Sequence, residues 1–83
     1  MPLYMDIHEH LPGLSAEAVA GAHARDVEVG PQHNVDYKKY WYNVQTGTIF
    51  CLVEAPSPEL ASQVHREAHG LVADRIWEVI EVA

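Results

Sequence analysis

Two histidines four residues apart, His65 and His69, are the strongest chemical signal in this 83-residue sequence. They lie in a segment with helical periodicity, and side chains at positions i and i+4 of a helix project from one face about one turn apart. Both imidazoles could therefore hold a single metal ion. No glutamate follows the first histidine, so the helix motif of zinc proteases is absent. The angle of both histidines from the apolar stripe predicts that they border the core rather than fill it. The alternative to metal binding is a pair of solvated imidazoles that favour the negative end of the helix dipole.

A second group of metal-binding side chains lies near the N-terminus. Asp6, His8 and His10 alternate with apolar residues, and residues two apart on a β-strand point to the same face. Imidazole nitrogen suits nickel, copper and zinc, and a carboxylate adds an oxygen donor. These three residues are therefore predicted metal ligands, together with His65 and His69. Asp6 and His8 could equally form a polar hydrogen-bonded pair in a dimer interface.

The other histidines and the single cysteine carry weaker signals. His23 falls on the apolar stripe of its predicted helix, which favours a hydrogen-bonded core histidine over a metal ligand. His33 follows a Gly-Pro pair and is predicted to be solvated. Cys51 is central in an apolar strand, which is typical of an inert buried thiol; a soft metal ligand or a nucleophile is the minority interpretation.

Composition narrows the classes of partner. Twelve Asp and Glu against five Lys and Arg give a formal charge of −7, which disfavours nucleic acid because its phosphates would be repelled. A hydrophobic share of 48% supports a globular core in one domain over residues 1–83. No apolar run approaches the roughly 20 residues of a membrane span. The lack of a signal-peptide pattern and the single cysteine predict a cytoplasmic protein with no membrane association.

Turn and capping residues divide the chain into six elements. Ser15 and Ser57 are good N-caps, and Gly47 and Gly70 stand where a hairpin and a helix C-terminus favour glycine. The predicted order is a strand at 3–10, a helix at 15–30, strands at 35–43 and 48–53, a helix from 57 to 70 and a strand at 76–82.

This β-α-β-β-α-β order is typical of the ferredoxin-like sandwich, an α+β fold with a four-stranded antiparallel sheet and both helices on one face. In that wiring the first strand and the second helix end at the same edge of the sheet, which brings His8 and His10 towards His65 and His69. The third and fourth strands carry apolar residues on both faces, so we expect a partner to cover the face without helices. A symmetric homodimer, sheet against sheet, is the simplest solution.

Three stretches of the chain resemble a family of small bacterial proteins: MPLYMDIH at the N-terminus, FCLVEAP in the middle and VHREAHGL in the second helix. That family includes a nickel-binding actinobacterial protein with a dimeric ferredoxin-like fold. The resemblance extends over essentially the whole chain, although the Gly30-Pro31 pair departs from the family's pattern. It implies a homodimer with a capacity for nickel, whereas the ligand residues named above rest on spacing alone.

The sequence thus predicts a non-enzymatic, homodimeric protein that binds nickel, or alternatively zinc or copper, and that buffers or sequesters it. The competing hypothesis is a small dimeric α/β-barrel enzyme or small-molecule-binding module, with a pocket between the sheet and the helices. An enclosed pocket reached by His and Tyr side chains would favour this competitor, and histidines clustered at the surface would favour the metal. A third hypothesis is an interaction module in which the histidines have no role.

Overall fold

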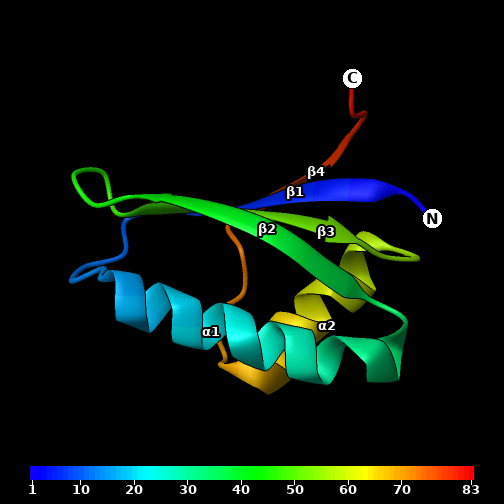
Figure 1. The fold of residues 1–83 in the computed structure, drawn as a ribbon, viewed down its shortest axis with the longest axis horizontal. Coiled ribbons are helices and arrows are strands. Elements are labelled where there is room, and N and C mark those ends of the chain that lie inside the picture. Colours follow the sequence, from blue (N-terminus) through cyan, green and yellow to red (C-terminus); the bar gives the residue numbers. More distant parts are fainter.

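Both helices cover one face of a four-stranded sheet in the computed structural model, which describes residues 1–83 (Figure 1). All strand pairs are antiparallel, and the strand order is β2-β3-β1-β4. The predicted β-α-β-β-α-β order and the ferredoxin-like sandwich are confirmed. The elements are β1 (Leu3–His8), α1 (Ala16–Val29), the 3₁₀ turn η1 (Gly30–His33), β2 (Asp36–Asn43), β3 (Thr48–Glu54), α2 (Pro58–Ala68) and β4 (Arg75–Val79).

The helices begin and end at the predicted capping residues. The hydroxyls of Ser15 and Ser57 each accept a backbone N–H from the first turn of the helix that follows. Gly70 has a φ of 83° just after α2, and its N–H donates to the carbonyl of His65. The Gly30-Pro31 pair ends α1 by tightening the chain into η1. Neither α1 nor α2 combines the length and the apolarity that a membrane crossing requires.

The last strand is shorter than predicted. β4 ends at Val79, whereas the sequence pattern extends to Val82. Val79 pairs with Leu3, the first residue of β1, so no β1 residue remains to pair with the chain beyond it. The C-terminal residues therefore leave the sheet and point away from the helices (Figure 1).

The core lies between the sheet and the helices. Asp6 and His8 alternate with Tyr4 on the helix-facing side of β1, so two polar side chains enter this core and need polar partners there. The apolar residues of the core form one buried cluster: Tyr4, Val19, Val35, Tyr37, Ile49, Cys51, Val53, Ala55, Ala61 and Val64.

The opposite face of the sheet carries apolar side chains without a covering layer. Trp41 pairs with Phe50 across β2 and β3, and Trp77 pairs with Met5 across β4 and β1. The two tryptophans are 50% and 57% exposed. A patch of this kind on a small protein is typical of an interaction surface.

Helix α1 turns a different face inward than its apolar pattern predicts. The predicted stripe contains Val19, His23 and Val27, but Val27 is exposed and its neighbour Asp26 is buried. One residue corresponds to a rotation of about 100° around a helix. Aspartate is rarely buried without a partner, and the partner of Asp26 is His65, which lies 39 residues further along the chain. The apolar pattern of α1 therefore does not indicate this burial.

Replacement of Gly47 by alanine should destabilise the protein by about 1–3 kcal/mol. Gly47 has a φ of 68°, and an added Cβ would lie 2.5 Å from the carbonyl oxygen of Leu11. Gly21→Ala is the matched control, since Gly21 lies in α1 with open space around it and should gain about 0.5–1 kcal/mol. Urea unfolding measures both changes, and a neutral Gly47→Ala substitution would contradict the strained turn.

Candidate metal centre

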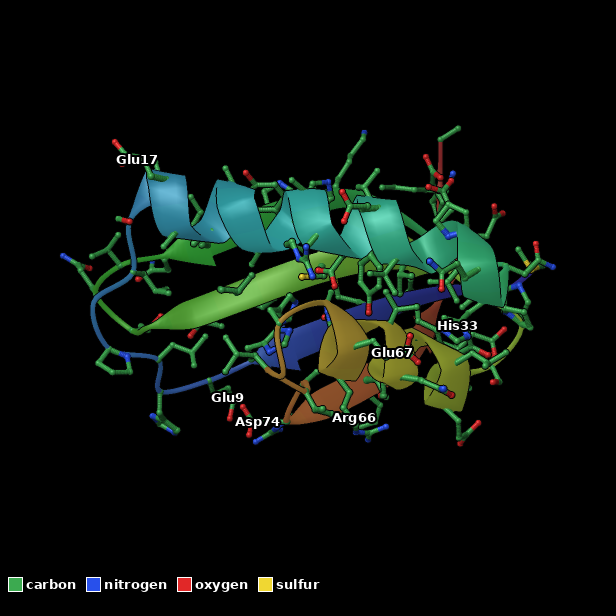
Figure 2. The ribbon with its side chains drawn as sticks, turned by 90° about the horizontal axis from the view of Figure 1, so that it is seen from below. Glu9, Glu17, His33, Arg66, Glu67 and Asp74 are labelled. Atoms are coloured by element: carbon green, nitrogen blue, oxygen red, sulfur yellow. The ribbon has the colours of Figure 1, made fainter.

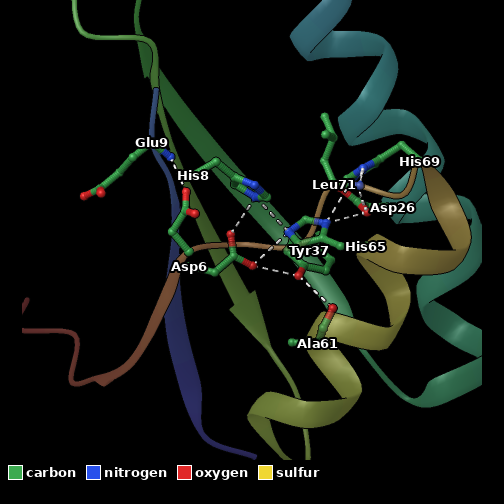
Figure 3. A network of polar contacts seen from close by, with 10 residues as sticks. Asp6, His8, Glu9, Asp26, Tyr37, Ala61, His65, His69 and Leu71 are labelled. Atoms are coloured by element: carbon green, nitrogen blue, oxygen red, sulfur yellow. Dashed lines mark hydrogen bonds and ion pairs between the residues drawn. The ribbon is translucent and has the colours of Figure 1, made fainter. Parts of the chain in front are cut away.

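Five polar residues from three elements meet between the sheet and the helices (Figure 3). Asp6 and His8 come from β1, Asp26 from α1, and His65 and His69 from the last turn and the C-cap of α2. The first four are at most 4% exposed, and His69 is half-buried. Because so many titratable groups are buried together, they must serve as hydrogen-bond and charge partners for one another.

His65 is the centre of the cluster because each of its ring nitrogens faces a carboxylate. Its Nε2 lies 2.9 Å from Asp6 Oδ2, and its Nδ1 lies 2.9 Å from Asp26 Oδ1. A second imidazole stands beside each nitrogen: His8 Nε2 is 3.3 Å from Nε2, and His69 Nε2 is 3.1 Å from Nδ1. The ring therefore bridges the strand side and the helix side of the cluster.

The two carboxylates determine the charge of His65. Burial alone would lower the pKa of His65, but hydrogen bonds to Asp26 and Asp6 outweigh burial and raise this pKa to about 9. At neutral pH the ring is an imidazolium that donates both N–H groups. Burial would likewise raise the pKa of Asp6 and of Asp26, but the hydrogen bonds from His65 hold both below their ordinary value. These three groups together carry one net negative charge.

Tyr37 holds Asp6 from β2. Its hydroxyl donates to Asp6 Oδ2 at 2.8 Å and lies 3.0 Å from the carbonyl oxygen of Ala61. Burial, reinforced by the charge of Asp6, raises the pKa of Tyr37 far above its ordinary value, so the hydroxyl stays a donor. A β-bulge between Tyr37 and Lys39 inserts one extra residue, which lets both Tyr37 and Tyr40 face the helices.

The proton position on His69 follows from its backbone contact. Its Nδ1 accepts a hydrogen bond from the N–H of Leu71 at 3.1 Å, so a neutral ring carries its proton on Nε2. That Nε2–H donates to Asp26, whose two oxygens lie 3.1 and 3.2 Å away. Asp26, His65 and His69 are close enough to share an ion, but this proton occupies the lone pair that an ion would use. His69 and Asp26 instead form a chain that orients the ring of His65.

The strand side of His65 has the spacing of metal ligands. Asp6 Oδ1 is buried with no hydrogen-bond partner and lies 3.4 Å from His8 Nε2. Donor atoms about 2.1 Å from one ion lie about 3.0 Å apart at a right angle and about 3.4 Å apart in a tetrahedron. The two imidazole nitrogens lie 3.3 Å apart, His8 Nε2 lies 3.4 Å from Asp6 Oδ1 and His65 Nε2 lies 2.9 Å from Asp6 Oδ2, so each pair is close to this spacing although the two rings face different oxygens of the carboxylate. These residues therefore fit a divalent transition-metal ion.

Cys51 adds a sulfur atom to the same group. It pairs with Asp6 across β1 and β3, and its donor atom lies within 4.8 Å of those of Asp6, His8 and His65. Burial, together with the charge of Asp6, raises the pKa of the Cys51 thiol far above its ordinary value. The thiol is therefore buried and protonated, as predicted, and is no nucleophile without a metal ion to remove its proton.

A cavity lies beside the cluster and is lined by four of its residues, by His23, Tyr40 and Cys51, and by apolar side chains. The four cluster residues are His8, Asp26, His65 and His69. Its volume of about 30 Å³ is enough for about two water molecules. Pockets for organic ligands are at least about tenfold larger. The His- and Tyr-lined pocket of the enzyme hypothesis is thus present, but its volume is small for an organic substrate.

Comparison with known proteins places this geometry in a family. A family model described as "Nickel responsive protein SCO4226-like" matches residues 4–79. The chain belongs to the SCO4226-like family. A solved structure, the crystal structure of SCO4226 from Streptomyces coelicolor A3(2), matches with a TM-score of 0.91 and 37% sequence identity over 98% of this chain and 99% of that chain. No significant match was found among curated proteins. The predicted resemblance to a small bacterial nickel-protein family is confirmed.

In this SCO4226-like chain, four of the five predicted ligand residues meet and one does not. Asp6, His8, His65 and His69 belong to the cluster, whereas His10 is exposed beyond the end of β1 with a φ of 58°. The prediction that His10 continues the strand was wrong, because β1 ends at His8. His65 also does not border the core: it is 1% exposed and fills it.

The two remaining histidines also differ from their predictions. His33 is not simply solvated, since its Nε2 lies 3.0 Å from Glu67 Oε1 on the outer surface of the helices (Figure 2). His23 packs on the ring of Tyr40 with centroids 4.7 Å apart, so it belongs to the interior as predicted. Its Nδ1, however, is buried without a hydrogen-bond partner.

Asp26 and Tyr37 are the cluster residues that sequence reasoning missed. Asp26 follows Val19 and His23 by seven and three residues, which is the spacing of one helix face, and this was the available signal. No sequence signal indicates the position of Tyr37. In a regular strand Tyr37 and Tyr40 would lie on opposite faces of the sheet, and only the bulge brings both to the face that the helices cover.

The metal-free protein should lose stability as the pH rises above 6.5, the pKa of an ordinary histidine. The pKa of His65 rises from 6.5 to about 9 on folding, so its contribution is complete below pH 6.5 and is lost as the pH rises through 9. We expect the free energy of unfolding to fall by about 2 kcal/mol between about pH 6.5 and about pH 8.5. Urea unfolding measures this change, and His65→Gln should remove it. A wild-type stability that is constant or rises over this interval contradicts the charged His65.

Proposed function

We propose that this protein binds a nickel ion through Asp6, His8 and His65, with Cys51 as a further donor within reach. The observation that carries the proposal is the meeting of two imidazole nitrogens, 3.3 Å apart, at the buried carboxylate of Asp6. His65 Nε2 lies 2.9 Å from its Oδ2, and His8 Nε2 lies 3.4 Å from its Oδ1, which has no hydrogen-bond partner. Such an oxygen is costly in the interior unless a donor or a cation meets it. The description of the family as nickel-responsive favours nickel, although zinc and copper suit the same donors.

We propose that Asp26 and His69 orient the ligand His65 and do not bind the ion themselves. A metal-bound histidine usually donates its second N–H to a carboxylate, which fixes the ring and raises its basicity. The Nδ1–H of His65 has such a partner in Asp26 at 2.9 Å, and His69 holds Asp26 in turn. His69, predicted from its spacing as a ligand, is therefore proposed as a supporting residue.

Charge favours a divalent ion over the proton that His65 carries. With His65 protonated the cluster has one net negative charge, whereas a divalent ion that displaces this proton leaves Asp6, Asp26 and the ion neutral together. Because the pKa of His65 is about 9, proton competition extends to about that pH. Nickel affinity should therefore keep rising well above pH 6.

Holding the ion, rather than catalysis, is the proposed role, as a buffer or sequestering protein of the cytoplasm. A cavity of about 30 Å³ leaves room for water beside the ion but not for an organic substrate. Nickel is then the cargo of the protein. The α/β-barrel enzyme hypothesis would require the helices to move apart to make a larger pocket.

We further propose that two copies pair through the open faces of their sheets. A groove on this face is lined by Leu3, Met5, Lys39, Trp41, Leu52, Val79, Ile80 and Glu81, which are mostly apolar. A twofold axis sets one patch against its own copy, so a single apolar surface serves both partners. The exposed Trp77 extends the same surface. The nickel ligands lie on the other side of the sheet and need no contribution from the second copy.

Substitution of the proposed ligands should abolish nickel binding. Calorimetric titration with Ni²⁺ at neutral pH is expected to show one ion per chain in the wild type and none in His8→Ala or Asp6→Asn. Asp26→Asn should keep the stoichiometry but weaken binding about 10- to 100-fold, because it removes only the support of His65.

The matched control for these variants is His10→Ala, which removes an exposed histidine two residues from His8. Its nickel affinity should equal that of the wild type. Loss of binding in His10→Ala, with binding retained in His8→Ala, would place the ion at the surface and contradict the proposed site. Circular dichroism of each variant separates lost binding from lost folding.

The dimer is tested by its mass in solution. Light scattering should give twice the 9.3 kDa of one chain for the wild type and a single chain for Trp77→Glu. Val27→Lys is the control, since Val27 is 48% exposed on α1, away from the open sheet face, and the variant should remain dimeric. A monomeric wild type at micromolar concentration would refute the pairing. Nickel affinity should be unchanged in Trp77→Glu.

A further inference from the structure

The proposed nickel ligands are closed off from solvent, so an ion can reach them only if part of the structure moves. Asp6, His8 and His65 are at most 4% exposed. The cavity that adjoins His8 and His65 has a volume of about 30 Å³, which is enough for about two water molecules. An octahedral divalent ion in solution carries about six. The ion must therefore pass a boundary of the cavity and lose most of its water on the way.

Leu71 separates this cavity from a larger groove at the surface. It lines both the cavity and the groove, which has a volume of about 190 Å³ and is also lined by residues 11–14. Val19, Ala22 and Ile49 line both spaces as well, but they are fixed in α1 and β3. Leu71 is 48% exposed and lies outside the helices and strands. It is therefore the part of the boundary that can move without breaking an element.

The segment that carries Leu71 is held mainly at its two ends. Residues 70–73, the strap, join α2 to β4 (Figure 1). Gly70 donates its N–H to α2 at one end, and at the other Asp74 donates its N–H to β1 and accepts the N–H of Glu9 (Figure 2). The two residues after Leu71 make no backbone hydrogen bond. Segments with so few backbone contacts open locally more readily than the core around them.

One contact ties the closed strap to the metal cluster. The N–H of Leu71 donates to Nδ1 of His69 at 3.1 Å (Figure 3). His69 in turn contacts Asp26, which accepts from His65. This chain uses the backbone of Leu71 and not its side chain. A substitution of the Leu71 side chain can therefore change how the cavity is closed while the support of His65 stays in place.

We propose that the strap is the entrance of the metal site and that the side chain of Leu71 closes it. Outward movement of Leu71 joins the cavity to the surface groove, and the ion passes through to His8 and His65, exchanging water for these donors. The opening belongs to the metal-free fold, whereas its role in passing nickel rests on the proposed nickel site. Leu71 then sets the rates of nickel uptake and release but not the affinity, because it is no ligand.

Opening of the strap can be measured without a metal. Cys51 lines the same cavity, is buried and is the one cysteine of the chain, so its reaction with a thiol reagent reports access to the cavity. Methyl methanethiosulfonate should modify Leu71→Ala about five- to tenfold faster than the wild type, because the smaller side chain gives up less apolar contact on opening. Val72→Ala is the matched control, since Val72 is 40% exposed on the same strap but lines neither the cavity nor the groove. It should react at the wild-type rate.

Nickel exchange is the second measurement. Uptake of Ni²⁺ and its release to EDTA are followed by the visible absorption of the ion. Both should accelerate in Leu71→Ala by the same factor as the labelling, which leaves Kd unchanged, and neither should change in Val72→Ala. Urea unfolding of each variant gives the change in the unfolding equilibrium constant. A labelling rate that rises only by this change overturns local opening, because Cys51 would then react from the unfolded chain.

The other outcomes separate the entrance from the nickel site itself. Labelling that is equally fast in the wild type and Leu71→Ala, or that rises as much in Val72→Ala, overturns an entrance at Leu71 and leaves the nickel proposal standing. Faster release without faster uptake also overturns it, because Leu71 would then stabilise the bound state. A wild type that binds no nickel refutes the nickel site and the role of the strap as its entrance, while labelling that depends on Leu71 would still establish the opening.

Discussion

The structure depends on one buried interaction, the imidazole of His65 held between the carboxylates of Asp6 and Asp26. These contacts, both at 2.9 Å, tie α2 to β1 on one side and to α1 on the other. Removing one partner of such a buried group leaves uncompensated charge, which typically costs about 3–5 kcal/mol. The apolar sandwich around it supplies the driving force for folding, and the cluster restricts how the helices sit on the sheet. The contacts that assemble the fold therefore also position the donor atoms.

The arrangement keeps the two surfaces of the sheet for different purposes. The helix-facing side holds the polar cluster, where Asp6, His8 and His65 converge and Tyr37 fixes the carboxylate of Asp6. The open side is apolar and carries the exposed tryptophans. Successive strand residues alternate between these sides, so Met5 and Ile7 serve the open face while their neighbours on β1 serve the cluster. One short strand thus contributes to both surfaces.

The fold could be predicted from the sequence because its determinants are local. Serine N-caps, glycines at positive φ and alternating strands specify every element, and two strand ends differ: β1 stops at His8, and β4 has no partner strand beyond Val79. The site could be predicted only where residue spacing is local, as for Asp6 with His8 on β1 and for His65 with His69 at the end of α2. Asp26 and Tyr37 were not predicted because their partners lie 39 and 31 residues away in the sequence. The bulge that turns Tyr37 inward also has no recognisable pattern in the sequence. His10 was included because alternation alone does not show where a strand ends.

The most direct test of this account is a crystal structure of the nickel-loaded protein, with anomalous scattering measured at the nickel edge. The account predicts one strong peak per chain in the interior, about 2.1 Å from His65 Nε2 and His8 Nε2 and in contact with Asp6, with Asp26 still accepting from His65 Nδ1. Peaks confined to surface side chains such as His10 or His33, with His65 still bridging Asp6 and Asp26 in the loaded protein, would contradict it.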